Sequence, residues 1–234
     1  MTRTLILDLD GTLIDSVPDL LASMNRLTAA KGVAPFAAPE LAAMVGDGTS
    51  VLVQRAMQAR GRQATREDAD AFLADYSAHP AVHSRPFPGV PPTLRALRQE
   101  GWRMAVCTNK PEAPARALLE ALGLLQFFDA IGGGDSFPVR KPDPAHLLAT
   151  IEAAAGDRAA SVAVGDHRND VLAATGAGVP CIFALWGYGP ASMGAGAAAT
   201  ATCFEDVPRI AVDLLATPSP PGTSSHRRTS ACGN

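Results

Sequence analysis

The chain alternates short apolar runs with longer segments in which apolar residues recur every three or four positions. Runs of strand length lie at residues 4–9, 103–107, 161–165 and 180–184, and a shorter one lies near 129–132. Helix-like segments follow the four longer runs. Strands that alternate with helices are typical of a parallel sheet covered by helices. The pattern therefore predicts an α/β fold with a doubly wound parallel sheet.

The periodicity between residues 16 and 85 is helical, and no strand pattern appears there. Helices are expected at 18–30, 39–45, 49–60 and 66–78. Ser16 and Asp19 have the spacing of a capping box, with Asp in place of Glu or Gln. Residues 194–201 are low in complexity and are expected to form a short loop or a helix before the last strand-like residues.

These segments predict a core domain with an insertion. We expect residues 1–15 and 86–216 to form the α/β core, and residues 16–85 to form a small helical cap domain after the first strand. The Pro-rich segment 86–91 is interpreted as a stiff return linker. Residues 217–234, rich in Pro, Ser and Gly, have the composition of a disordered tail.

Composition and charge narrow the class of protein. With 234 residues, 47% of them hydrophobic and 18% charged, the chain can bury a sizeable core. A net charge of −3 gives no support for a nucleic-acid partner. No apolar stretch approaches the ~20 residues of a membrane span, and no secretory signal is visible. Four cysteines without metal-ligand spacing favour a reducing, cytoplasmic setting.

Two carboxylates stand at the end of the first apolar run, in Asp8-Leu9-Asp10-Gly11-Thr12. Residues i and i+2 of a strand point the same way, so both acids are expected to face one small volume. Like charges so close require a cation or a shared proton. A divalent metal would keep Asp8 ionised as a nucleophile and leave Asp10 for proton transfer. The alternative is an ordinary turn before a helix.

Three further segments place polar residues at expected strand ends or helix starts. They are residues 103–110, which end in Thr108-Asn109-Lys110; residues 140–144, which contain Lys141-Pro142; and residues 161–170, which contain Asp166 and Asp170. Open α/β sheets bind their ligands at the carboxyl ends of strands. Phosphoryl transfer needs a nucleophile and positive charge around the phosphoryl oxygens, and these segments supply both kinds of group.

With these four motifs in this order, the chain resembles the haloacid dehalogenase-like (HAD) hydrolase superfamily, and within it the phosphoglycolate phosphatase group. The resemblance implies a Mg²⁺-dependent phosphomonoester hydrolase that forms an aspartyl phosphate on Asp8. It also implies that Asp8 and Asp166 bind the metal through side chains and Asp10 through its backbone carbonyl. Asp10 would protonate the leaving group and then activate water.

The same resemblance assigns the remaining site residues. Thr108 and the amide of Asn109 would donate to the phosphoryl oxygens, and Lys141 would supply fixed positive charge. Asp170 would orient a metal-bound water or Lys141. The chain has 17 arginines and only three lysines, two of which, Lys110 and Lys141, fall within motifs. A compact ammonium suits a crowded phosphate site better than a planar guanidinium, which modestly supports Lys141.

Substrate choice is expected to depend on the cap. As a hypothesis, Gly46 and Gly48 line the leaving-group pocket, since glycine permits close backbone approach; an ordinary turn between helices is the alternative. The carboxylate of 2-phosphoglycolate would suit an arginine fork. The cap arginines that could supply it are Arg26, Arg55, Arg60, Arg62 and Arg66. His167 is expected to be an exposed residue at the start of a helix.

Several alternatives stay open at this stage. Related phosphatases of small organic phosphates and sugar-phosphate mutases share all four motifs. A receiver-type signalling module would lack the helical insertion and the second acid of the first motif. A dehalogenase would not need Asp10, and a phosphonate-cleaving relative would need a cap lysine, for which Lys31 is the candidate. A small phosphoester is the expected partner, and the protein is expected to be a monomer or a homodimer.

Overall fold

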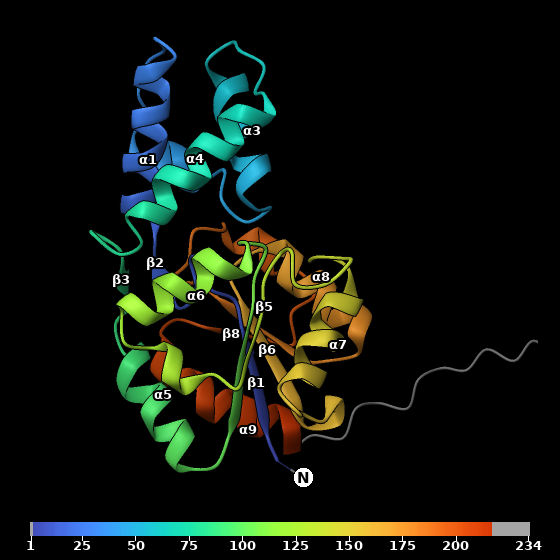
Figure 1. Ribbon diagram of the computed structural model, residues 1–234. Coiled ribbons are helices and arrows are strands. Elements are labelled where there is room, and N and C mark those ends of the chain that lie inside the picture. Colours follow the sequence, from blue (N-terminus) through green and yellow to red (C-terminus); the bar gives the residue numbers. More distant parts are fainter. Residues whose placement is uncertain (1, 217–234) are drawn as a thin grey trace, which may run out of the picture.

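A six-stranded parallel sheet forms the centre of the computed structural model, which describes residues 2–216 (Figure 1). The predicted tail at 217–234 lies outside the described residues. The strands stand in the order β5-β4-β1-β6-β7-β8. Their bounds are Thr4–Leu7 (β1), Arg103–Cys107 (β4), Ala130–Gly132 (β5), Ser161–Gly165 (β6), Cys181–Ala184 (β7) and Ala199–Ala201 (β8). The α/β class and the five expected strands are confirmed.

Helices cover both faces of this sheet because alternate strand residues point to opposite faces. On one face Leu5 and Leu7 pack in a cluster with residues of α5, α6 and α9, and on the other Ile6 packs with residues of α7 and α8. These helices span Val90–Gln99 (α5), Glu112–Ala121 (α6), Pro144–Ala153 (α7), Arg168–Ala177 (α8) and Val207–Ala216 (α9). The central strand β1 is therefore fully buried, as expected for a continuous apolar run.

The sixth strand, β8, lies earlier in the chain than expected. It lies within residues 194–201, which the sequence favours as a loop or a helix, and it pairs with β7 at the edge of the sheet. Its residues, Ala-Thr-Ala, carry little of the β-branched and aromatic character that marks a strand. Pairing with a neighbouring strand, which is a tertiary effect, decides its conformation.

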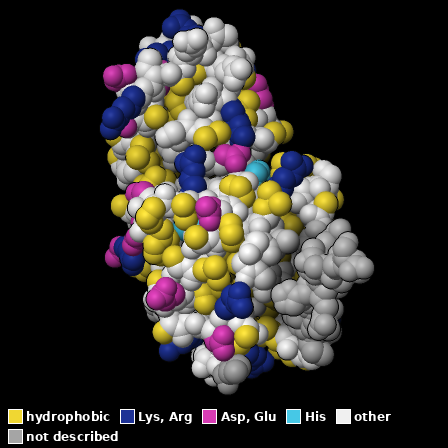
Figure 2. Space-filling view, turned by 90° about the vertical axis from the view of Figure 1, so that its right-hand side faces the viewer, with side chains coloured by type: hydrophobic (Ala, Val, Ile, Leu, Met, Phe, Trp, Pro, Cys, Tyr) yellow, Lys and Arg dark blue, Asp and Glu magenta, His cyan; other side chains and the backbone are white. Residues whose placement is uncertain are grey.

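Four helices form a separate layer at the carboxyl edge of the sheet, which we call the cap (Figure 1). They span Val17–Ala30 (α1), Ala38–Ala42 (α2), Thr49–Ala59 (α3) and Arg66–Ala78 (α4). The cap has a hydrophobic cluster of its own, which includes Met24, Leu41, Val53 and Phe72. Two short antiparallel strands, Ile14–Asp15 (β2) and Arg85–Pro86 (β3), connect it to the core. Figure 2 shows the cap and the core as two lobes that meet at a waist.

Short 3₁₀ segments complete the described chain. They lie at Leu125–Phe127, Arg158–Ala160, Ala191–Gly194 and Phe204–Asp206. No helix within residues 2–216 has the length and apolar character that crossing a membrane requires.

The capping box expected at Ser16 and Asp19 was wrong. Ser16 precedes α1, but its hydroxyl donates to Asp10 Oδ1 at 2.5 Å and caps no backbone N–H. Asp19 instead accepts hydrogen bonds from the backbone N–H groups of His83 and Ser84, at 2.8–3.1 Å, and from the Ser84 hydroxyl. Both side chains therefore hold the connection between cap and core, a role that local spacing does not reveal.

Candidate active site

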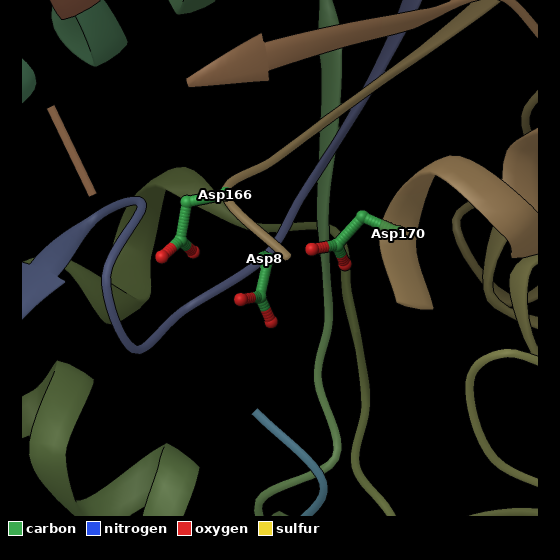
Figure 3. Close-up of side chains that lie close together, drawn as sticks. All are labelled: Asp8, Asp166 and Asp170. Carbon is green, nitrogen blue, oxygen red and sulfur yellow. The ribbon is translucent and has the colours of Figure 1, made fainter. Parts of the chain in front are cut away.

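Three buried carboxylates meet at the carboxyl edge of the sheet (Figure 3). Asp8 follows β1, Asp166 follows the neighbouring strand β6, and Asp170 lies in the first turn of α8. One oxygen from each lies within 4.8 Å of the others. Because β1 and β6 are adjacent and parallel, the residues after them are brought together although 158 positions separate them in sequence. The predicted proximity of Asp8 and Asp166 is therefore present.

The turn after Asp10 lets Asp166 approach this closely. Gly11 has a φ of +90°, and a Cβ atom there would overlap the carboxylate of Asp166. The Thr12 hydroxyl donates to Asp166 Oδ1 at 2.9 Å, and the backbone N–H of Tyr188 donates to Oδ2 at 2.8 Å. These contacts hold the carboxylate in one orientation beside Asp8.

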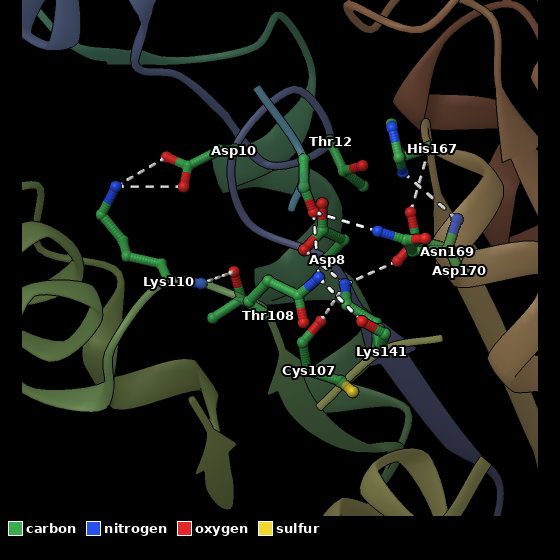
Figure 4. A network of polar contacts seen from close by, with 12 residues as sticks. Asp8, Asp10, Thr12, Cys107, Thr108, Lys110, Lys141, His167, Asn169 and Asp170 are labelled. Atoms are coloured by element: carbon green, nitrogen blue, oxygen red, sulfur yellow. Dashed lines mark hydrogen bonds and ion pairs between the residues drawn. The ribbon is translucent and has the colours of Figure 1, made fainter. Parts of the chain in front are cut away.

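Lys141 supplies positive charge within the same cluster (Figure 4). Its ammonium donates to Asp8 Oδ1 at 2.7 Å, to Asp170 Oδ1 at 2.6 Å and to the carbonyl oxygen of Cys107 at 2.6 Å. Burial alone would lower the pKa of Lys141, but Asp170 and Asp8 raise it well above its ordinary value. All three hydrogens of the ammonium are engaged, so its position is fixed.

Negative charge in the cluster exceeds the charge of Lys141. Burial raises the pKa of Asp8 to about 6, although Lys141 opposes the rise. Burial, followed by repulsion from Asp8 and Asp170, raises the pKa of Asp166 to about 7. These three carboxylates, two of them bonded to the one ammonium, form a set of oxygen ligands suited to a hard divalent cation such as Mg²⁺.

Asp8 and Asp10 line one cavity, as expected, but strand alternation does not bring them there. Strand β1 ends at Leu7, so the alternation does not extend to Asp10, which lies in the turn. The Asp10 carboxylate points toward Lys110 (Figure 4), whose Nζ lies 3.0 and 3.1 Å from its two oxygens. Both acids therefore border the cavity between core and cap although their carboxylates have different partners.

Thr108 and Asn109 follow β4, as expected, and both are buried. Thr108 lines the cavity beside Asp8. The side-chain amide of Asn109 donates to the carbonyl oxygens of Gly46 and Lys141, at 3.0 Å each. This amide therefore ties the cap loop to the Lys141 loop.

The cap loop at 45–48 packs directly on the core. Gly46 has a φ of +126°, and a Cβ atom there would lie 2.6 Å from the ring of His167. Asn169 donates to Asp47 Oδ1 at 2.6 Å. His167 was expected to be exposed, and that prediction was wrong: its ring is half-buried under this loop, where burial lowers its pKa. A loop from the cap covers it, which its place in the sequence does not show.

A small cavity lies between the cap and the core. Its lining consists of Asp8, Asp10, Leu20, Val45, Gly46, Gly48, Thr49, Leu52, Thr108, Asn109 and Lys110. The two glycines proposed for the leaving-group pocket are thus among its walls. The open volume is about 30 Å³ with the cap in this position.

The cap arginines considered for a substrate carboxylate do not reach this cavity. Arg26 pairs with Asp75, Arg55 with Asp47, and Arg60 with Glu40. Arg62 and Arg66 line a different groove, between α3 and α4. Lys31, the candidate for phosphonate chemistry, pairs with Asp68 after the end of α1 and is also absent from the cavity lining. Composition could place these residues in the cap but could not show which way they face.

Two residues near the site were missed as contributors. His146 is fully buried; its Nδ1 accepts from the backbone N–H of Lys141 at 3.2 Å, and its Nε2 donates to the Gly133 carbonyl at 3.0 Å. Lys110 was noticed as a rare lysine but received no role. Its place directly after Thr108-Asn109 was the signal that could have identified it.

Comparison with known proteins agrees with this geometry. Residues 2–178 match the family model of the haloacid dehalogenase-like hydrolases. The phosphoglycolate phosphatase of Agrobacterium fabrum is 47% identical over 187 residues, which cover 78% of this chain and 80% of that protein. The phosphoglycolate phosphatase of Rhodospirillum rubrum is 39% identical over 234 residues, covering 95% and 94%. A crystal structure of a predicted phosphoglycolate phosphatase from Haemophilus somnus superposes with a TM-score of 0.81 at 29% identity, covering 89% of this chain and 97% of that one. The chain belongs to the haloacid dehalogenase-like hydrolase family.

Proposed function

We propose that this protein hydrolyses 2-phosphoglycolate through an aspartyl phosphate formed on Asp8. The observation that carries the proposal is the position of Asp8: it lines the cavity under the cap, it is bound to Lys141 at 2.7 Å, and it lies beside Asp166. A carboxylate held in this way is a fixed nucleophile with positive charge next to the position of a phosphoryl group.

The other residues have supporting roles in this proposal. Thr108 and the backbone N–H of Asn109 donate to phosphoryl oxygens, and Lys141 neutralises part of their charge. Asp10 protonates the departing alkoxide and later takes a proton from the water that attacks the aspartyl phosphate. Asp170 positions Lys141, because its Oδ1 accepts from the ammonium while its Oδ2 accepts from the backbone N–H of His167 at 3.0 Å.

Mg²⁺ is the proposed cofactor. Asp8 and Asp166 would hold it through their side chains and Asp10 through its backbone carbonyl. When bound, the ion offsets charge on the carboxylates and on the phosphoryl group. The charge count of the cluster supports this assignment, because three buried carboxylates, Asp8, Asp166 and Asp170, lie together with one ammonium, that of Lys141.

Two observations favour a small substrate. The open volume under the closed cap is only about 30 Å³, so little space is available for a leaving group when the cap is closed. Gly46 and Gly48 bring the cap backbone against His167 and the Asn109 carbonyl, which further limits that space. The relatives named above as phosphoglycolate phosphatases make 2-phosphoglycolate the first choice among small phosphoesters.

The proposal is tested by measuring inorganic phosphate released from 2-phosphoglycolate and from a panel of larger phosphoesters, with Mg²⁺ and with EDTA. We expect metal-dependent turnover with 2-phosphoglycolate preferred, and loss of nearly all turnover in Asp8→Asn. Asp157→Asn is a matched control, because Asp157 is exposed before β6, at the opposite edge of the sheet. Substantial metal-dependent activity in Asp8→Asn would refute the nucleophile assignment.

A further inference from the structure

Lys110 is a buried cation on the side of the cavity away from the carboxylate cluster (Figure 4). Only 5% of its side-chain surface is exposed. Its ammonium contacts both oxygens of Asp10 and lies 4.4 Å from the centre of the Tyr76 ring. The Asp10 carboxylate, at 3.0 Å, is the ion-pair partner of this buried ammonium. A buried ammonium is costly unless it is paired, which makes its position beside a ligand cavity informative.

Lys110 is also the one cationic side chain in the cavity lining found among the described residues. Lys141 lies deeper, and its three hydrogens are committed to Asp8, Asp170 and the Cys107 carbonyl. The cap arginines do not line the cavity. A second negative group on a substrate, separate from the phosphoryl group, therefore has Lys110 as the cation that borders the cavity.

The hydroxyl of Tyr76 lies close to the same ammonium. Tyr76 comes from cap helix α4 and is only 2% exposed, and among residues 2–216 its hydroxyl makes no hydrogen bond of good geometry. The Lys110 ammonium lies over its ring. Buried hydroxyls are nearly always hydrogen-bonded. An unsatisfied donor next to an ammonium is the arrangement that an incoming carboxylate would complete.

The geometry also limits the length of the ligand. Asp10 stands between Lys110 and the site of the reaction, and in the proposed mechanism Asp10 meets the leaving-group oxygen. A carboxylate that reaches Lys110 must therefore lie only a few bonds from that oxygen. This requirement describes the phosphate ester of a short 2-hydroxy acid.

We propose that Lys110, together with the Tyr76 hydroxyl, binds the carboxylate of such a substrate and sets the specificity of the enzyme. This inference rests on the phosphatase function proposed above. Because Lys110 belongs to the core and Tyr76 to the cap, the complete carboxylate site exists only when the cap is closed. Specificity then comes from a core residue next to the phosphate motif, with a cap residue completing the site.

The test compares kcat/KM for 2-phosphoglycolate with kcat/KM for ethyl phosphate, a substrate of similar size without the carboxylate. In Lys110→Met we expect the ratio of the two values to fall at least 30-fold, since truncating one member of a buried charge pair costs about 2–5 kcal/mol. Using the ratio cancels any effect that losing the partner of Asp10 has on both substrates. Lys110→Arg should restore part of the ratio, and Tyr76→Phe should lower it several-fold.

Arg140→Met is the matched control, because it removes an equal charge from an exposed side chain close to the cap loop. We expect it to change the ratio less than about threefold, as screened electrostatic steering would. If the wild type prefers 2-phosphoglycolate and Lys110→Met keeps that preference, the carboxylate assignment is wrong while the phosphatase function stands. If the wild type shows no preference, the proposed substrate and this inference fail together.

Discussion

Neutralising Asp166 should stabilise the metal-free protein at neutral pH. In Asp166→Asn the side-chain oxygen can still accept from the backbone N–H of Tyr188, while the new NH₂ group donates to the Thr12 hydroxyl, which reverses its role. The substitution therefore keeps the local hydrogen bonds and removes one charge from a cluster in which Asp8 and Asp170 repel it. Removing this charge should therefore raise the free energy of unfolding.

The magnitude follows from the pKa of Asp166, which is about 7 in the folded chain against an ordinary value of 3.8. Between these values the folded chain holds a proton that the unfolded chain has released, so the free energy of unfolding falls as pH rises through this window. Linkage gives a loss of about 2–3 kcal/mol between pH 5 and pH 8 for this group. Asp166→Asn should lack that loss, and its advantage over the wild type should grow with pH.

Urea denaturation followed by circular dichroism in EDTA, from pH 5 to pH 8, measures this difference. Asp170→Asn is the control, because it makes the same chemical change in the same cluster but removes an ion pair with Lys141 at 2.6 Å. We expect Asp170→Asn to lower the free energy of unfolding at pH 8, by about 1–3 kcal/mol. If Asp166→Asn gains nothing relative to the wild type as pH rises, the description of the cluster as an excess of buried negative charge is wrong.

Three further predictions follow from the same structure. Mg²⁺ should raise the melting temperature, and by more at pH 8 than at pH 5.5. At the lower pH the ion must displace protons from Asp8 and Asp166, whose pKa values are about 6 and about 7. A calorimeter that finds the same shift in melting temperature at both pH values would contradict this. Burial, with the charge of Lys141, lowers the pKa of His146 to about 4, so the free energy of unfolding falls as pH drops through 6.5, the ordinary pKa of histidine. Between pH 7.5 and pH 5, His146→Gln should therefore lose about 2 kcal/mol less of its free energy of unfolding than the wild type loses. Gly46→Val should lower kcat/KM for 2-phosphoglycolate at least tenfold, because the Cβ of the valine would overlap the His167 ring. Unchanged steady-state rates in a folded variant would show that activity does not require the cap loop to pack against His167.

The sequence predicts the sheet and the carboxylate cluster well because both depend on short-range patterns. Apolar runs of four or five residues mark β1, β4, β6 and β7, and polar residues directly after a parallel strand must lie at one edge of the sheet. Asp8 and Asp166 could be brought together on this argument without any knowledge of the structure.

The features that sequence reasoning missed all depend on contacts between distant segments. The direction of the Asp10 side chain is set by Lys110, 100 positions later, and the burial of His167 is set by the cap loop at Gly46. The cap arginines are turned away by acidic partners that composition could not pair with them. Side-chain direction in loops has no periodicity to follow, so it had to come from the structure.

The central claim, a covalent phosphoenzyme on Asp8, can be measured directly. The enzyme is mixed with 2-phosphoglycolate and Mg²⁺, quenched within one turnover and reduced with borohydride, which converts an acyl phosphate to an alcohol. Mass spectrometry of the N-terminal peptides should then find homoserine in place of aspartate at residue 8, and at no other acidic position of the site. Turnover with unmodified Asp8, or with the modification at Asp10 or Asp166, would contradict the account.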